Sequence, residues 1–259
     1  MTPPYDQPVN LLTQSILTFG SWGLTLVFLI IALRFCLKEK TPFYLLVMIA
    51  AMVAAFAEPL YDEGMDLLFY VPGIWSHFTA YDIPQPNWTH SGYAVLYGSA
   101  AMYIGRQIHL GQLTRSAIWM WAGIEFLMSC SFEMIGINGG AYEYWGPHEL
   151  RVLNYPIAIG ILESAQVITF AVLAAKLREH SKSSLNLLWL LLLFPCTFYL
   201  ANFGAGSPLV IALHLENTTR PIVFAATILS IIGAFGLVRL VSMLLPETRT
   251  TTAPAHKEA

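Results

Sequence analysis

The chain has 259 residues, of which 56% are apolar and only 11% are charged, and its formal net charge is -3. Soluble domains carry about 25% charged residues, so this composition is typical of a chain that lipid solvates over much of its length. The small net charge gives no reason to expect nucleic acid as a partner.

Seven apolar stretches are long enough, or nearly so, to cross a membrane, because a bilayer core of about 30 Å needs about 20 apolar residues in a helix. They cover approximately residues 14–36, 43–62, 91–108, 117–138, 155–176, 184–203 and 221–244. The pattern of the second stretch is compatible with an amphipathic continuation of its helix through Tyr70. The sequence predicts an all-α, polytopic membrane helix bundle of about seven transmembrane helices. This single domain covers residues 1–245, and the polar residues 246–259 are expected to be a disordered cytoplasmic tail.

Basic residues orient the predicted bundle. Eleven of the thirteen Lys and Arg residues fall in the loops after spans one, three and five or in the tail, and these are Arg34, Lys38, Lys40, Arg106, Arg115, Lys176, Arg178, Lys182, Arg239, Arg249 and Lys257. The opposite side holds only Arg151 and Arg220. By the positive-inside rule the eleven face the cytoplasm, which places the N-terminus outside and the C-terminus in the cytoplasm.

The two long loops on the outer side are rich in Tyr, Trp, Pro and Gly. They cover residues 63–90 and 139–154, and the first contains no Lys or Arg. Aromatic residues favour the membrane interface, but loops of this length and composition also predict a cap that packs over the outer helix ends.

Carboxylates occur inside three of the predicted spans, where ionisable groups are costly and are functional candidates by default. Glu58, Asp62 and Asp66 are four residues apart, so they share one face if the second helix continues. Asp62 and Asp66 are equally open to interpretation as ordinary loop acids in water. The fourth and fifth spans contribute a further polar set, Glu125, Ser129 and Glu133 in the fourth and Glu163 in the fifth. Taken alone, Glu125 is explained equally well as a functional group and as a structural group that bonds to a neighbouring helix.

The predicted orientation puts Glu58, Glu133 and Glu163 in the outer half of the membrane. No Lys or Arg lies in the outer halves of the spans, so some of these carboxyls are expected to carry a proton near neutral pH. A protonated carboxyl beside an ionised one is the usual composition of a general acid/base pair. We predict a polar cavity beneath the outer loops, with Glu58, Asp62, Glu133 and Glu163 as the acid/base set and with Tyr97, Asn138, Tyr144 and Asn202 orienting a substrate.

Several other chemistries lack their sequence signals. The spans contain no histidine cluster for a di-iron centre, and the last span has no Lys for a retinal Schiff base. No phosphate-binding loop or nucleophile elbow is present, and the three cysteines show no CxxC spacing. The predicted site therefore uses no metal and no cofactor.

Short motifs in the outer half resemble those of the AveC-like spirocyclase family of bacterial membrane proteins. The likeness covers about residues 58 to 165. It consists of Glu58-Pro59 with Asp62, Phe78-Thr79-Ala80-Tyr81 with Pro84 and Pro86, the run from Gly140 to Gly146, and Tyr155-Pro156. The resemblance implies cofactor-free acid/base chemistry on a lipophilic molecule, either spiroketal closure or dehydration. The family has a plainer pattern of small residues after the Tyr-Pro pair, so Glu163 is expected to be particular to this chain.

The leading hypothesis is a membrane-embedded cyclase, isomerase or dehydratase in a bacterial cytoplasmic membrane. Its partners are the lipid bilayer and a lipophilic small-molecule substrate. A proton-coupled transporter that uses the same carboxylates as a relay is one alternative. A non-catalytic subunit of a membrane complex is another, and small residues in the last span, such as Gly233 and Gly236, would suit its contact with a membrane protein partner whose identity the sequence does not indicate.

Overall fold

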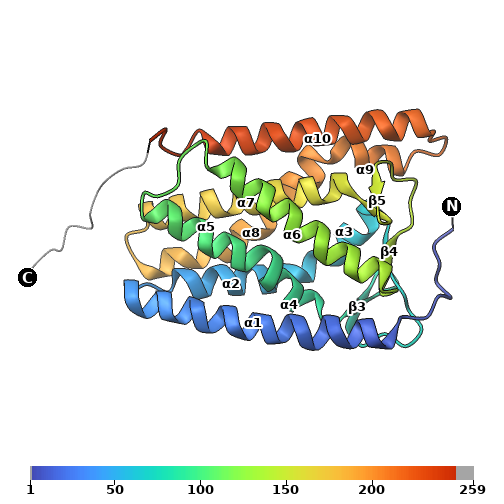
Figure 1. Cartoon of the computed structure of the whole chain (residues 1–259), viewed down its shortest axis with the longest axis horizontal. Coiled ribbons are helices and arrows are strands. Elements are labelled where there is room, and N and C mark those ends of the chain that lie inside the picture. Colours follow the sequence, from blue (N-terminus) through green and yellow to red (C-terminus); the bar gives the residue numbers. More distant parts are fainter. Residues whose placement is uncertain (1, 249–259) are drawn as a thin grey trace, which may run out of the picture.

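The computed structural model describes residues 2–248, and its long helices run side by side along one axis (Figure 1). Six helical segments are long and apolar enough to cross a membrane, as the sequence predicts for an all-α membrane bundle. They are α1 (Leu11–Glu39), α2 with α3 (Phe43–Met65), α6 (Ile118–Asn138), α7 (Ile157–His180), the run Ser184–Ala205 that contains α8 (Leu190–Tyr199), and α10 (Arg220–Ser242).

The stretch predicted as the third span is also helical but is broken into three pieces. Helix α4 (Thr89–Tyr93) passes into a π-helical turn (Ala94–Gly98) and then into α5 (Ser99–His109). All five residues of the π-helical turn are buried. This segment therefore lies within the bundle, where its polar residues meet protein instead of lipid.

Two of the membrane-length segments contain breaks that the sequence analysis did not predict. Helix α2 (Phe43–Ala54) is separated from α3 (Glu58–Met65) by a 3₁₀ turn, Ala55–Ala57. The sixth predicted span begins in a 3₁₀ turn, Ser184–Trp189, and ends in a π-helix, Leu200–Ala205, after α8. A short extra helix, α9 (Ser207–Leu213), follows it. Such breaks change the direction in which the following side chains point, because each turn type has its own number of residues.

The proposed extension of the second span through Tyr70 is wrong. The helix ends at Met65, and Asp66 caps it in the left-handed conformation with φ 52°. The residue after the helix end leaves the helical path, so Asp66 does not share a helical face with Glu58 and Asp62.

Helix α7 lies at the centre of the bundle. It packs against α5, α6, α8 and α10, and most of its residues are buried. Its buried residues include several Ala together with Gly160 and Ser164, and small residues of this kind allow neighbouring backbones to approach closely. A group in the first half of α7, such as Glu163, which is only 2% exposed, is therefore surrounded by protein.

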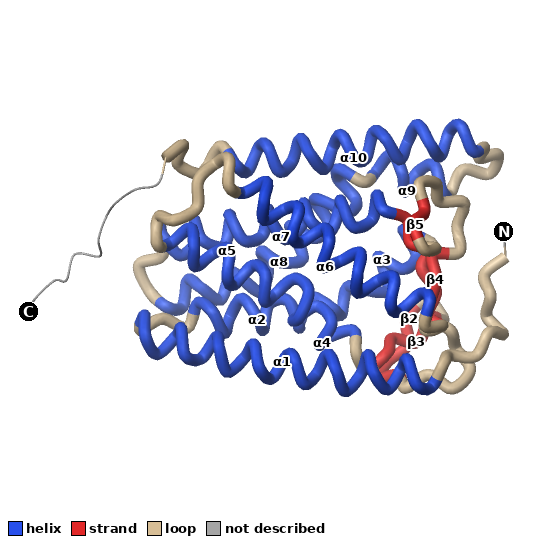
Figure 2. Tube along the Cα trace, viewed as in Figure 1, coloured by secondary structure: helices blue, strands red, loops and turns tan. Residues whose placement is uncertain are grey.

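Short strands gather at the end of the bundle where α1 and α10 begin (Figure 2). They form three antiparallel pairs, β1 (Leu67–Phe69) with β4 (Tyr142–Tyr144), β2 (Ser76–Ala80) with β3 (Ile83–Pro86), and β5 (Arg151–Val152) with β6 (Tyr155–Pro156). The β1–β4 pair joins the two long aromatic loops. These loops therefore pack together over one set of helix ends, as the sequence predicts.

The opposite end of the bundle is held by a cluster of polar side chains around Glu39. Arg106 Nε donates to Glu39 Oε1 at 2.9 Å, and Arg178 Nη2 donates to Glu39 Oε2 at 2.9 Å. The Tyr44 hydroxyl also donates to Glu39 and accepts from Arg178 at 2.7 Å. One carboxylate thus connects α1, α2, α5 and α7.

The predicted tail is described only at its first residues. The Arg115 amide donates to the Pro246 carbonyl, and Arg115 pairs with Glu247 at 2.9 Å. Residues 249–259, which make up most of the predicted tail, lie outside the described residues.

Candidate functional site

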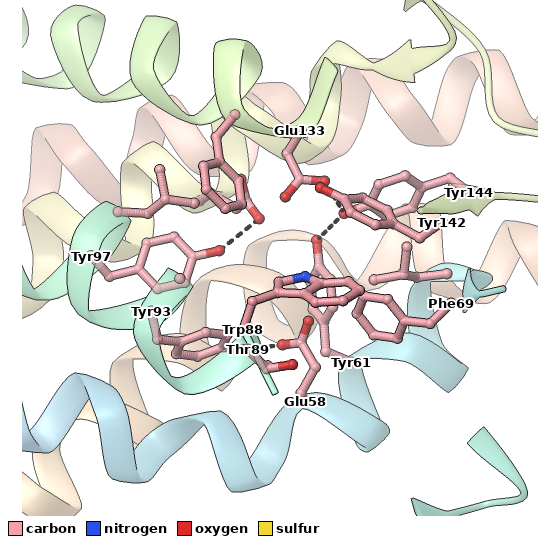
Figure 3. Close-up of a pocket in the computed structure, with 15 residues that line it drawn as sticks. Glu58, Tyr61, Phe69, Trp88, Thr89, Tyr93, Tyr97, Glu133, Tyr142 and Tyr144 are labelled. Atoms are coloured by element: carbon pink, nitrogen blue, oxygen red, sulfur yellow. Dashed lines mark hydrogen bonds between the residues drawn. The ribbon is translucent and has the colours of Figure 1, made fainter. Parts of the chain in front are cut away.

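Three glutamates from three different helices line one enclosed cavity, which we call the glutamate chamber (Figure 3). Glu58 is the first residue of α3, Glu133 lies near the end of α6, and Glu163 lies in the first half of α7. The complete lining is Glu58, Tyr61, Leu67, Phe69, Trp88, Thr89, Gly92, Tyr93, Leu96, Tyr97, Phe132, Glu133, Tyr142, Tyr144 and Glu163. The sequence predicted that these carboxyl groups would meet beneath the outer loops, and they do.

Glu163 is the most heavily hydrogen-bonded of the three carboxyl groups. The Tyr97 hydroxyl donates to its Oε1 at 2.8 Å, and the Tyr155 hydroxyl donates to its Oε2 at 3.3 Å. Ser129, on α6, also donates to Oε2. Three hydroxyl donors from three elements therefore hold the Glu163 carboxyl group in one orientation.

Glu58 accepts a hydrogen bond from the Tyr93 hydroxyl. Tyr93 lies at the end of α4, and its ring meets the Tyr97 ring edge-on, with centroids 4.8 Å apart. Tyr97 lies within the π-helical turn that begins directly after Tyr93, and turns of this kind are frequent at functional sites. The tyrosine that donates to Glu58 is therefore in ring contact with the tyrosine that donates to Glu163.

Glu133 is connected to a pair of tyrosines. The Tyr144 hydroxyl lies 3.4 Å from Glu133 Oε2 and 3.3 Å from the Tyr61 hydroxyl. Burial, with the Glu133 carboxyl group nearby, raises the pKa of Tyr144 well above its usual range. Tyr144 therefore keeps its proton and acts as a donor to Glu133.

None of the described residues that line the chamber is Lys or Arg. The exposed fractions of Glu58, Glu133 and Glu163 are only 8%, 9% and 2%. Three buried carboxyl groups without a cation repel one another if all are ionised. The chamber thus brings three carboxyl groups together with no neutralising cation among its described lining residues.

The chamber is small. Its cavity volume is about 40 Å³, and a water molecule needs roughly 10–15 Å³ on this measure. Two or three water molecules would fill it, whereas small-molecule sites usually measure about 300–1,000 Å³. A substrate of ordinary size fits only if most of it lies outside the chamber or if the walls move.

Three of the eight predicted site residues lie elsewhere. Asp62 accepts from Gln85 Nε2 at 2.6 Å and faces a separate outer pocket of 260 Å³ that also contains Asp66 and His214. Its neighbour Tyr61 lines the chamber, but the Asp62 side chain is held by Gln85 towards the other pocket. The acid/base set that meets in the chamber therefore consists of Glu58, Glu133 and Glu163 only.

The two predicted asparagines do not reach the chamber either. Asn138, at the end of α6, is exposed and exchanges hydrogen bonds with Asn154 and the Leu153 carbonyl. Asn202 is buried in the π-helix after α8 and donates to the Phe198 carbonyl at 3.1 Å. Tyr97 and Tyr144 are the predicted substrate-orienting residues that do line the chamber.

The predicted site residues did not include four tyrosines that contact or line the chamber, Tyr61, Tyr93, Tyr142 and Tyr155. Two of them had a usable signal. Tyr61 follows Glu58 by three residues and Tyr93 precedes Tyr97 by four, spacings that share a helical face. Tyr142 and Tyr155 lie in the strands, where only the tertiary pairing brings them to the helices.

Comparisons with protein-family models, with curated proteins and with solved structures find no match for this chain. The fold and the site therefore define the class by themselves. It is an integral membrane helix bundle with an enclosed chamber that is lined by carboxyl and phenol groups.

Proposed function

We propose that this protein is a membrane-embedded, cofactor-independent cyclase, isomerase or dehydratase that acts on a lipophilic small molecule. The observation that carries the proposal is the meeting of Glu58, Glu133 and Glu163 in one enclosed chamber that no described Lys or Arg lines. Proton transfer by a positioned carboxyl group accelerates such reactions by about 10²–10⁴-fold.

The hydrogen bonds suggest how the roles divide. Three hydroxyl groups donate to Glu163, an arrangement that stabilises negative charge, so we assign Glu163 as the base. Glu133 accepts one long bond from Tyr144 and is free to face a substrate, so we assign it as the acid. Glu58, held by Tyr93, would exchange protons with either group.

The resemblance to the AveC-like spirocyclase family supports a ring closure or a loss of water. Both reactions need a proton donor and a proton acceptor in a site with little water. Glu58 and Glu133 lie within the part of the chain that carries the resemblance, and the family's bacterial origin supports a location in the cytoplasmic membrane.

We also propose seven membrane crossings, with the N-terminus outside and the C-terminus in the cytoplasm. The segment Thr89–His109 would be the additional crossing, since it is as long as α6, which has 21 residues. The excess of Lys and Arg at the end of the bundle near Glu39 supports this orientation. The glutamate chamber then lies in the outer half of the membrane.

Glu163→Gln tests the catalytic proposal. The amide cannot accept a proton at the substrate, so we expect the product to disappear and its precursor to accumulate. Comparative mass spectrometry of lipid extracts from cells that express the wild type or the variant measures both. Glu63→Gln is the matched control, because Glu63 lies on α3 beside the chamber residues but is exposed, and its extract should match the wild type.

Identical extracts from the wild type and Glu163→Gln would contradict the enzyme proposal. The small chamber volume favours one specific alternative, a proton relay in a carrier, because about 40 Å³ is enough for water and protons. In that case the wild type should drive pH-dependent uptake into proteoliposomes, and Glu163→Gln should abolish it.

A further inference from the structure

A second cavity lies within the membrane-spanning length of the bundle, between α6, α7 and α10. Its volume is 190 Å³, and we call it the lateral crevice. Its lining consists of Trp119, Ala122, Gly123, Phe126, Ile161, Ser164, Ala234, Phe235 and Val238. These helices are neighbours in Figure 1, and the rings of Trp119 and Phe235 lie 6.1 Å apart between α6 and α10.

The chemistry of this lining selects an apolar occupant. Apart from the Trp119 indole, Ser164 has the only polar side chain in it, and its hydroxyl donates to the Ala122 carbonyl at 2.7 Å. An apolar cavity of roughly 150 Å³ stays dry and binds benzene, so a cavity of 190 Å³ at this depth has room for part of a hydrocarbon chain.

The crevice and the glutamate chamber approach each other at Gly160. A methyl group on Gly160 would lie 3.4 Å from the Phe126 ring, which lines the crevice, and 3.2 Å from the Tyr155 hydroxyl. That hydroxyl is 3.3 Å from Glu163 Oε2. The same methyl group would lie 2.9 Å from Cys130 Sγ, so Gly160 is closely packed, and one layer of side chains separates the crevice from the hydrogen-bond network of Glu163.

We infer that the lateral crevice holds the hydrocarbon chain of the substrate, which reaches Glu163 sideways from the bilayer, past Gly160. This inference rests on the proposed function and names its substrate class, a lipid-soluble molecule with a flexible apolar chain. The chamber, at about 40 Å³, takes only the reacting group, and the β1–β4 pair covers the outer side. The crevice supplies the space that the chamber lacks.

Gly123→Leu is the direct test. Gly123 lines the crevice, and a Cβ atom added there meets nothing within 4 Å, so a leucine side chain begins in open space and is expected to reduce the volume of the crevice. Gly236→Leu is the matched control, because Gly236 also has nothing within 4 Å and lies on α10 outside the crevice lining. Neither change touches a chamber residue.

The probe is palmitic acid that carries a diazirine near the middle of its chain. Purified full-length protein in nanodiscs is irradiated with the probe, and the labelled peptides are identified by mass spectrometry. We expect saturable labelling of residues 119–126 and 234–238, which unlabelled palmitic acid competes away. Gly123→Leu should lower it roughly tenfold, equivalent to about 1.4 kcal/mol, and Gly236→Leu should leave it unchanged.

Labelling that spreads evenly over lipid-facing helices such as α1, or that Gly123→Leu does not change, would overturn the inference. The labelling does not require turnover, so Glu163→Gln should be labelled like the wild type even if the enzyme proposal fails. Conversely, a product that forms equally in the wild type and in Gly123→Leu would remove the chain-binding role of the crevice and leave the enzyme proposal intact.

Discussion

At the residue scale, the three chamber glutamates illustrate what one sequence can reveal. Glu58, Glu133 and Glu163 are recognisable because carboxylates inside apolar spans are costly and therefore informative. Asp62, Asn138 and Asn202 have the same polar character but lie outside the chamber. Polarity and depth can be estimated from sequence, whereas the direction of a side chain around its helix cannot.

The hydroxyl groups that hold the carboxyl groups were harder to predict. Ser129 and Tyr97 lie on different helices from Glu163, yet both donate to it. No local pattern links residues 34 and 66 positions away from Glu163 in the chain. Their role depends on the rotation of α6 and of the π-helical turn relative to α7.

A pH dependence of stability follows from His148, in the loop between β4 and β5. Its Nε2 lies 2.8 Å from the Met65 carbonyl, and burial lowers its pKa from 6.5 to about 3. The folded protein disfavours protonation of His148, so its contribution to stability is complete above pH 6.5 and is lost as the pH falls towards 3. We expect a loss of about 2 kcal/mol by about pH 5.

Thermal unfolding in detergent between about pH 5 and pH 8 measures this effect. His148→Gln keeps a donor for the Met65 carbonyl but has no proton to gain, so its melting temperature should vary less with pH. His180→Gln, at an exposed position on α7, should retain the wild-type dependence. An unchanged slope in His148→Gln would contradict the assignment.

At the scale of elements, helix breaks decide which residues meet. A π-helical turn adds a residue to a turn, which rotates the following side chains by about 100°. One such turn begins directly after Tyr93 and contains Tyr97, and another contains Asn202. The apolar stretches of the sequence were sufficient to locate the long helices. Their apolar composition did not indicate where π-helical turns would interrupt them.

The cluster around Glu39 leads to a prediction about how the helix ends opposite the strands are held together. Glu39 and Arg178 side chains are only 14% and 10% exposed, so replacing Glu39 leaves two poorly hydrated guanidinium groups without a carboxylate. We expect Glu39→Gln to destabilise the protein by about 1–3 kcal/mol, measured as a lower melting temperature in detergent.

Glu179→Gln is the control for this prediction. Glu179 pairs with Lys176 at 2.7 Å but its side chain is 59% exposed, and exposed ion pairs contribute about 0–1 kcal/mol. Its melting temperature should stay close to that of the wild type. Equal shifts of the melting temperature in Glu39→Gln and Glu179→Gln would show that the buried cluster contributes no more to stability than an exposed ion pair.

At the scale of the whole molecule, the proposed orientation can be measured by cysteine labelling. Thr219 and Lys38 are exposed near opposite ends of the bundle. In a Cys196→Ser background, which removes the one free cysteine that is exposed in residues 2–248, each is replaced by cysteine in turn. A membrane-impermeant maleimide applied to intact cells should label Thr219→Cys and spare Lys38→Cys until the membrane is permeabilised. The reverse pattern would invert the proposed topology.

The sequence by itself determined that this chain is a membrane helix bundle and roughly where its long helices run. Length and hydropathy are local properties, and the bilayer requires about 20 apolar residues in each crossing wherever it occurs. The sequence also indicated which carboxyl groups would be costly in lipid. These predictions need no knowledge of which helix lies beside which.

Only the tertiary structure decided which polar groups share one chamber and that an apolar crevice lies between α6, α7 and α10. Both depend on how helices rotate about their axes when they pack, and on where π-helical and 3₁₀ turns change that rotation. Ser129, Tyr97 and Tyr155 converge on Glu163 because α6, the π-helical turn and β6 surround α7. The physical reason is that packing energy is gained where the surface of one segment meets the surface of another. The sequence of a single segment describes only one of these two surfaces.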